Sequence, residues 1–171
     1  MKKVTTIALV LLASIAVSNH VSAQETATAT ATATIVTPIS ISKDVDMNFG
    51  NVAVQSTTGG TVVLTPGGVR SRTGGVTLPS TATGTVTAAS FTVTGTGNYS
   101  YSITLPSSAL TITSGANTMT VTNFTSNPSG TGTLTAGTQT LTVGATLNVG
   151  AAQPAGTYTS GTPFNVTVNY N

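Results

Sequence analysis

The chain has 171 residues, no cysteine, no tryptophan and one histidine, and it carries only five basic and three acidic side chains. This composition argues against a thiolate nucleophile, a structural zinc site and histidine-based acid–base catalysis, because each of these needs side chains that are scarce or missing here. It also argues against nucleic acid as a partner, since phosphate binding needs a basic stripe. We therefore expect a non-enzymatic protein with no catalytic residues, no cofactor and no metal ion.

Residues 1–23 have the three parts of a secretory signal peptide. Lys2 and Lys3 form a positive start, residues 7–17 form an apolar core, and residues 21–23 match the small-residue cleavage pattern. The apolar run is shorter than the ~20 residues that a membrane-spanning helix needs, so we expect no stable membrane span. The sequence predicts export, with passage through the periplasm to the cell surface or the exterior.

Residues 24–34 form an N-terminal extension in which Thr and Ala alternate from Thr26 to Thr34. Two hypotheses remain open for it. The extension is either a flexible leader whose last part pairs as the first strand, or a donor strand that completes the sheet of a neighbouring subunit. In the second case one face of the donor strand consists of Ala27, Ala29, Ala31, Ala33 and Ile35.

Residues 35–171 show the pattern of an all-β domain. Thr, Val and Ile are abundant, and apolar residues alternate with polar ones at a period of two, as on Leu141, Val143, Ala145, Leu147 and Val149. Without helices to carry parallel crossovers, the strands must pair mainly antiparallel, which predicts a two-layer β-sandwich of eight to ten strands. The expected strands lie near residues 27–41, 46–54, 61–65, 75–78, 85–94, 98–105, 110–113, 117–124, 139–149 and 163–170.

Two local features are also predicted within this domain. Residues 91–93 and 99–101, joined through the turn signal of Gly95 to Asn98, are expected to form a hairpin. Ala88 and Ala89 interrupt the alternation, which indicates a β-bulge.

The low charge content favours assembly. Sheet edges are normally protected by charged residues or proline, because their free N–H and C=O groups invite another chain. Once residues 1–23 are removed, three charges of each sign remain and the net charge is zero. We therefore expect the protein to associate with itself or with other surface subunits.

Charged residues offer two candidate sites. Asp44 and Asp46 could contribute to a calcium site or to glycosidase chemistry, and Arg70 and Arg72, in a Gly-rich loop, could touch acidic polysaccharide. Each pair also has an ordinary structural interpretation, as a solvated strand start or a solvated loop, and we favour it.

Tyr99, Tyr101 and Tyr158 could form a platform on which sugars stack, although core positions are the more usual place for such residues. This gives the alternative function, a secreted carbohydrate-binding or adhesion module that acts as a monomer.

Several segments carry a resemblance to a known family. These are ATATIVTPISI at residues 31–41, MNFG at 47–50, TGGVT at 73–77 and the long closing segment at 144–171. In order and spacing they resemble the exported bacterial domain-of-unknown-function family numbered 4402. The resemblance implies an exported all-β domain and names no activity.

The C-terminal segment is also similar to the last strand of chaperone–usher pilins and of the spore coat protein U domain. The similarity lies in an AGTY turn at residues 155–158 and in the alternating Phe164, Val166, Val168 and Tyr170. It implies an immunoglobulin-like sandwich that lacks its final strand, and a periplasmic chaperone and an usher as partners. It also implies that residues 164–170 face the chaperone or the next subunit and that Ala27 to Ile35 form the donor strand. The sequence therefore predicts a subunit of a surface fibre or coat that assembles by β-strand addition.

Overall fold

The computed structural model describes residues 24–171, and the predicted signal peptide at 1–23 lies outside the described residues. The chain divides into two units, residues 1–34 and 35–171, which we describe separately. In the first unit, residues 24–34 form no strand and are exposed. Between residues 24 and 171 no helix has the length and hydropathy needed to cross a membrane.

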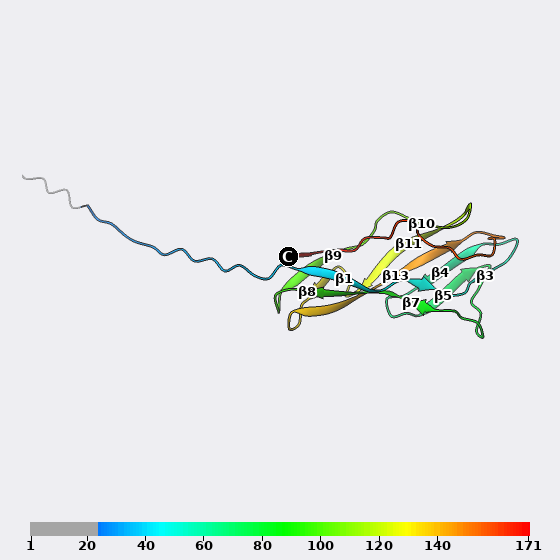
Figure 1. The fold of residues 1–171 in the computed structure, drawn as a ribbon, viewed down its shortest axis with the longest axis horizontal. Helices are drawn as coiled ribbons and strands as arrows, with labels where there is room; N and C mark the ends of the chain where they lie inside the picture. Colours follow the sequence, from blue (N-terminus) through cyan, green and yellow to red (C-terminus); the bar gives the residue numbers. More distant parts are fainter. Residues whose placement is uncertain (1–23) are drawn as a thin grey trace, which may run out of the picture. The chain divides into compact units, whose positions relative to one another are not determined.

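The second unit consists of fourteen strands, all paired antiparallel (Figure 1). The prediction of an all-β antiparallel fold is therefore confirmed. The strands are β1 (Ser40–Val45), β2 (Asn48–Phe49), β3 (Ala53–Val54), β4 (Gly60–Leu64), β5 (Arg70–Gly74), β6 (Val76–Thr77), β7 (Val86–Thr87), β8 (Ala89–Thr94), β9 (Ser100–Thr104), β10 (Leu110–Ser114), β11 (Asn117–Asn127), β12 (Thr131–Thr133), β13 (Thr138–Val149) and β14 (Thr167–Tyr170).

The longest strand, β13, organises a seven-stranded sheet. Its first half pairs with β8 and its second half with β4, while β11 runs along its other side. β1, β5 and β10 complete the sheet beyond β8, β4 and β11 respectively. All five apolar residues of the predicted face are buried, namely Leu141, Val143, Ala145, Leu147 and Val149. Their burial follows from the two-residue period of a strand, which places every second side chain on the same face.

Two apolar clusters lie along the buried face of β13. The first joins β8 and β13 to the three-stranded sheet β12–β9–β14 through residues such as Val93, Tyr101 and Val168. The second lies under the short pairs β2–β7 and β3–β6 and includes Val62, Val76 and Leu147. The core is therefore built by apolar packing between strands and the loops beside them, in a chain with no cysteine to form disulfides.

Several details differ from the prediction. The first strand begins at Ser40 rather than near residue 27, because alanines offer little apolar area to bury and Pro38 has no N–H for a ladder. The predicted hairpin of residues 91–93 and 99–101 is wrong, since β8 pairs with β1 and β13 whereas β9 pairs with β12 and β14. The turn between them crosses from one sheet to the other. The β-bulge predicted at Ala88 and Ala89 is found elsewhere. Ala88 separates β7 from β8, and the register shift in the β1–β8 pair lies on β1, between Lys43 and Val45.

Candidate functional site

The C-terminal segment forms one edge of the three-stranded sheet. β14 pairs with β9, from Thr167 opposite Thr104 to Tyr170 opposite Tyr101, and has no second partner strand among the described residues. Residues 160–166, which precede β14, have no backbone pairing within residues 24–171. Even so, exposed and half-buried side chains alternate from Phe164 onward, so the unpaired residues continue the pattern of the strand.

The ladder fixes which main-chain groups of this edge are free. The N–H of Asn171 donates to the carbonyl oxygen of Ser100 at 3.3 Å, so Asn171 faces β9. Because successive residues of a strand point their N–H and C=O groups to opposite sides, Asn169 and Thr167 also face β9. The N–H and C=O groups of Val168 and Tyr170 therefore point toward the free edge, and Phe164 and Val166 precede β14 at the same two-residue spacing.

The same four residues turn their side chains toward the first apolar cluster. The ring of Phe164 packs against Phe124, with 5.0 Å between centroids, and edge-on against Phe91 at 6.4 Å. Val168 is buried, but Phe164, Val166 and Tyr170 remain partly exposed. The core beneath the edge is thus nearly closed, and the apolar surface that remains is shallow.

Charge is distributed unevenly over the strand edges. Every charged residue of the second unit lies on β1, directly after it or on β5: Lys43, Asp44, Asp46, Arg70 and Arg72. Both strands are edges of the large sheet, and charges there discourage pairing with another chain. Residues 160–171, which include β14, carry no charge.

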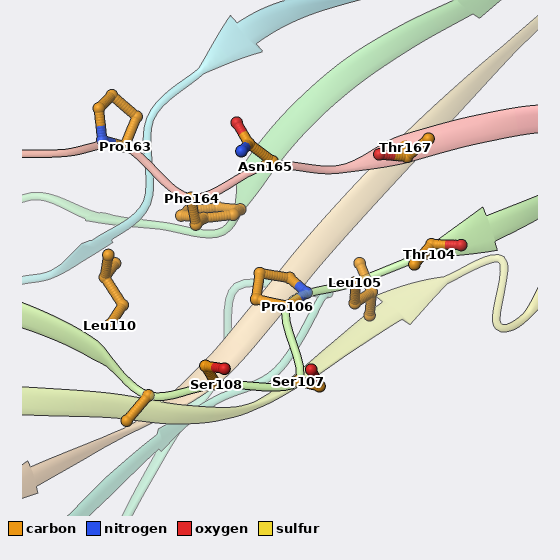
Figure 2. A pocket seen from close by; sticks show the side chains of 11 residues that line it. Thr104, Leu105, Pro106, Ser107, Ser108, Leu110, Pro163, Phe164, Asn165 and Thr167 are labelled. Carbon is orange, nitrogen blue, oxygen red and sulfur yellow. The ribbon is translucent and has the colours of Figure 1, made fainter.

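A hollow of about 410 Å³ opens beside the same segment. It lies where the end of β9 separates from the C-terminal segment, and its walls come from residues 104–110, residues 163–165 and Thr167. Figure 2 shows Pro163, Phe164 and Asn165 on one wall and Leu105, Pro106 and the serines that follow on the other. The lining is uncharged, so the hollow extends the neutral surface of the edge.

The charged pairs proposed from the sequence have structural partners. Asp46 forms an ion pair with Lys43 at 2.7 Å, and Asp44 accepts a hydrogen bond from Thr92 Oγ1 at 2.9 Å. Within residues 24–171 no three His, Cys, Asp or Glu side chains gather as metal ligands would. Arg70 and Arg72 lie on the edge strand β5, not in a loop as predicted.

The two arginines hold main-chain carbonyl groups of the second unit. Arg70 donates to the carbonyl oxygens of Phe49 and Asn51, and Arg72 donates to that of Val76 at 2.8 Å. These contacts fasten the short strands β2 and β6 to the edge of the large sheet, which is a structural use of both guanidinium groups.

The three tyrosines do not share one exposed surface. Tyr101 has 0% of its surface exposed and donates to Gln139 Oε1 at 2.8 Å, so its ring cannot stack on a sugar. Its burial raises the pKa of the phenol above the ordinary value. Tyr99 is 44% exposed and packs edge-on against Tyr170, while Tyr158 donates to the carbonyl oxygen of Pro154. Tyr101 is therefore a core residue, and the three tyrosines cannot form a sugar-stacking platform together.

Comparison with family models identifies the domain. A model described as a domain of unknown function, DUF4402, matches residues 39–170. The chain belongs to this family. No curated protein and no solved structure matches it.

The matched span contains every strand of the DUF4402 domain, from β1 to β14, and so includes the unpaired edge. The alanine-lined extension at residues 27–35 precedes that span. Sequence reasoning missed the hollow, the free segment at 160–163 and the hydroxyl contacts of Tyr170. All three depend on residues far apart in the chain, and no local pattern marks them.

Proposed function

We propose that this protein is an exported, non-enzymatic structural subunit of a surface fibre or coat, and that it assembles by β-strand addition to the free edge of residues 164–170. One observation carries the proposal: the domain has its charges on two other edges of its sheets and leaves the edge of β14, with the segment before it, neutral and without a second partner strand among the described residues. Such an edge is a template for another strand.

The extension has the properties of a matching donor. It is exposed, it forms no strand within its own unit, and its alternation places Ala27, Ala29, Ala31, Ala33 and Ile35 on one face. Small side chains suit a shallow acceptor, because the core under the edge is already nearly closed. Affinity then comes mainly from the main-chain hydrogen bonds of the added strand, as in other strand additions.

The unpaired edge also accounts for the proposed partners, a chaperone and an usher. A neutral open edge is prone to unwanted pairing before assembly, so it needs cover during export. A periplasmic chaperone that holds residues 164–170, and an usher that exchanges it for the next subunit, would meet that need. An assembled fibre or coat at the cell surface is the end state we propose.

A proline substitution tests the acceptor edge directly. The N–H of Val166 makes no backbone hydrogen bond within the described residues, so Val166→Pro removes a donor that an incoming strand would use. The matched control is Val166→Ala, which trims the side chain and keeps the N–H. We expect both variants to fold, as judged by circular dichroism, and only the proline variant to lose assembly.

Deletion of residues 25–34 tests the donor side. Negative-stain microscopy of cells and size-exclusion chromatography of the purified protein should show filaments or oligomers for the intact chain and none for the deletion. Equal assembly of both would refute the role of the extension. A full-length chain that stays monomeric at high concentration would instead support the alternative of a monomeric binding module.

A further inference from the structure

The large sheet has three outer strands, and only two of them carry charged residues. β1 holds Lys43 and Asp44, and β5 holds Arg70 and Arg72. The third outer strand, β10, pairs with β11 and contains neither a charged residue nor a proline. Charge, proline and a covering loop are alternative means of keeping another chain away from a sheet edge. β10 has only the last of these available.

The hydrogen bonds show which groups of β10 an incoming strand would use. The N–H of Thr113 donates to the carbonyl oxygen of Thr159 at 2.9 Å, and the N–H of Thr159 donates to the carbonyl oxygen of Thr113 at 3.0 Å. Thr113 therefore faces away from β11. Because the direction of the main-chain groups alternates along a strand, Thr111 also faces outward, and the other residues of β10 face β11.

Residues 153–159, which we call the cover loop, are fastened to both strands of the β10–β11 hairpin. One contact is the pair just described, on β10. The other is made by Gln153, whose Nε2 donates to the carbonyl oxygen of Thr118 on β11 at 3.1 Å. The same nitrogen donates to Tyr158 Oη at 2.9 Å, and that hydroxyl donates to the carbonyl oxygen of Pro154 at 2.8 Å. These bonds brace the cover loop against the edge.

The cover loop also lies close to the end of β10. A Cβ atom at Gly156 would overlap Ser114 Oγ, so only glycine fits there without a shift of the serine. With the loop in place, Thr111 keeps the one outward pair of main-chain groups on β10 that makes no hydrogen bond within the described residues. A single residue is too short to template a strand, since strands usually have three residues or more.

We propose that the cover loop conceals a second assembly surface, and that it prevents β10 of one copy from pairing with β10 of another. Antiparallel pairing about a two-fold axis would place Thr111 of each copy opposite Thr113 of the other and join two large sheets into one. Such a contact uses the same surface on both copies, so it would end at a closed dimer. The inference goes beyond the function proposed above, because it concerns another edge and does not involve the N-terminal extension.

The composition of the chain makes this protection necessary. Once residues 1–23 are removed the net charge is zero, so copies have little charge repulsion to keep them apart. The free N–H and C=O groups of an uncovered β10 would then be open to a second copy.

Thr159→Pro tests the cover loop. It removes the N–H that donates to Thr113 and puts ring atoms close to the carbonyl oxygen that accepted it, whereas the control Thr159→Ala keeps the N–H. Both changes are made in the full-length chain that already carries Val166→Pro, so that strand addition at the other edge does not contribute. We expect both variants to fold, as judged by circular dichroism, and only the proline variant to dimerise, as judged by light scattering after size-exclusion chromatography.

Amide hydrogen exchange locates the contact between the copies. In the alanine variant we expect slow exchange at Thr113 and fast exchange at Thr111. In the dimer of the proline variant we expect slow exchange at both residues, because β10 of the second copy would bond both. A folded proline variant that keeps the size of its parent, or a dimer in which Thr111 still exchanges fast, would overturn the inference.

A second variant loosens the cover loop without changing its main chain, and it decides the question if the proline variant does not fold. Gln153→Ala with Tyr158→Phe removes the side-chain bonds of the loop. We expect exchange at Thr113 to become about five- to tenfold faster, as the loss of one hydrogen bond would cause, and the dimer fraction to exceed that of Thr159→Ala. Unchanged exchange, or faster exchange without dimers, would overturn the inference.

The proposed function is read separately, from whether Val166→Pro alone abolishes assembly. A failure of that test leaves the cover loop to be judged by the difference between Thr159→Pro and Thr159→Ala, and a failure of the cover loop leaves strand addition at residues 164–170 unaffected.

Discussion

The phenol of Tyr101 donates a hydrogen bond to Gln139 Oε1 at 2.8 Å, and the same oxygen accepts the N–H of Thr133 at 2.9 Å. Tyr101 lies on β9, Thr133 on β12 and Gln139 on β13. The amide oxygen of one side chain therefore ties the three-stranded sheet to the large sheet beside Tyr101, a buried member of the first apolar cluster.

The burial of Tyr101 makes stability sensitive to alkaline pH. Burial raises the pKa of Tyr101 above its ordinary value of about 10, so the folded state favours the neutral phenol. The stabilisation is complete below the unfolded-state pKa and is lost as the pH rises above about 10, because the unfolded chain then releases a proton that the folded chain retains. Urea unfolding at pH 8 and pH 11 should show a larger loss of stability for the natural chain than for Tyr101→Phe.

The Tyr101→Phe variant also serves as the control, because the other tyrosines titrate in both proteins and cancel in the comparison. At pH 8 we expect it to be less stable by about 1 kcal/mol, the usual contribution of one hydrogen bond. Equal losses between pH 8 and pH 11 in both proteins would show that Tyr101 does not cause the alkaline sensitivity.

The second prediction concerns the hydroxyl of Tyr170, whose hydrogen bonds should stabilise the folded domain. Tyr170→Phe removes the bonds to Thr37 and Thr96 and leaves the part-buried N–H of Thr96 without its partner. We expect a loss of about 1–3 kcal/mol in the free energy of unfolding, measured in urea. Tyr99→Phe is the matched control, since its ring packs against Tyr170 and its hydroxyl makes no hydrogen bond within the described residues. Its stability should change by no more than about 0.5 kcal/mol. Similar losses in the two variants would show that the hydrogen bonds of the Tyr170 hydroxyl are not the cause.

The alternation of side chains was enough to predict much of the fold. On β13 it placed all five buried residues on the correct face, because burial of every second side chain is a local property of a strand. The pairing of β8 and β9 with different sheets was not predictable in the same way. A period of two shows which face is buried and does not show which neighbour the strand meets. β5 was missed because Arg70–Gly74 has no large apolar side chain.

The candidate site was predicted in part. Phe164, Val166, Val168 and Tyr170 do share one face, which the alternation indicated. The residues that define the end of that edge could not be found locally, since Thr37 and Tyr170 are separated by 133 positions in the sequence. The presence of charge on the β5 edge became visible only when Arg70 and Arg72 proved to lie on a strand rather than in a loop.

Gly144 marks the point where β13 exchanges β8 for β4. Val143 pairs with Ala89 and Ala145 pairs with Leu64, so the chain turns from one partner to the other at this residue. A Cβ atom at Gly144 would overlap the carbonyl oxygen of Leu64, which is backbone and cannot move aside easily.

We therefore expect Gly144→Ala to lower the free energy of unfolding by about 1–3 kcal/mol or more, as overpacking does elsewhere. Gly161→Ala is the control, because a Cβ there meets no atom within 4 Å and the residue has no positive φ. Thermal unfolding followed by circular dichroism compares the two. An unchanged melting temperature for Gly144→Ala would show that β4 can retreat from β13 at little cost.

Adjacent residues of β13 test whether burial on one face holds the domain together. Leu141 is fully buried in the first cluster, whereas its neighbour Thr140 is exposed on the opposite face. Leu141→Ala removes buried methyl groups and leaves a cavity, so we expect a loss of about 2–5 kcal/mol, while Thr140→Ala should change stability by no more than about 0.5 kcal/mol. Urea unfolding of both variants measures the difference. A domain without disulfides depends on its apolar core for stability. Equal and small effects of the two substitutions would therefore mean that the apolar face of β13 is not its main source of stability.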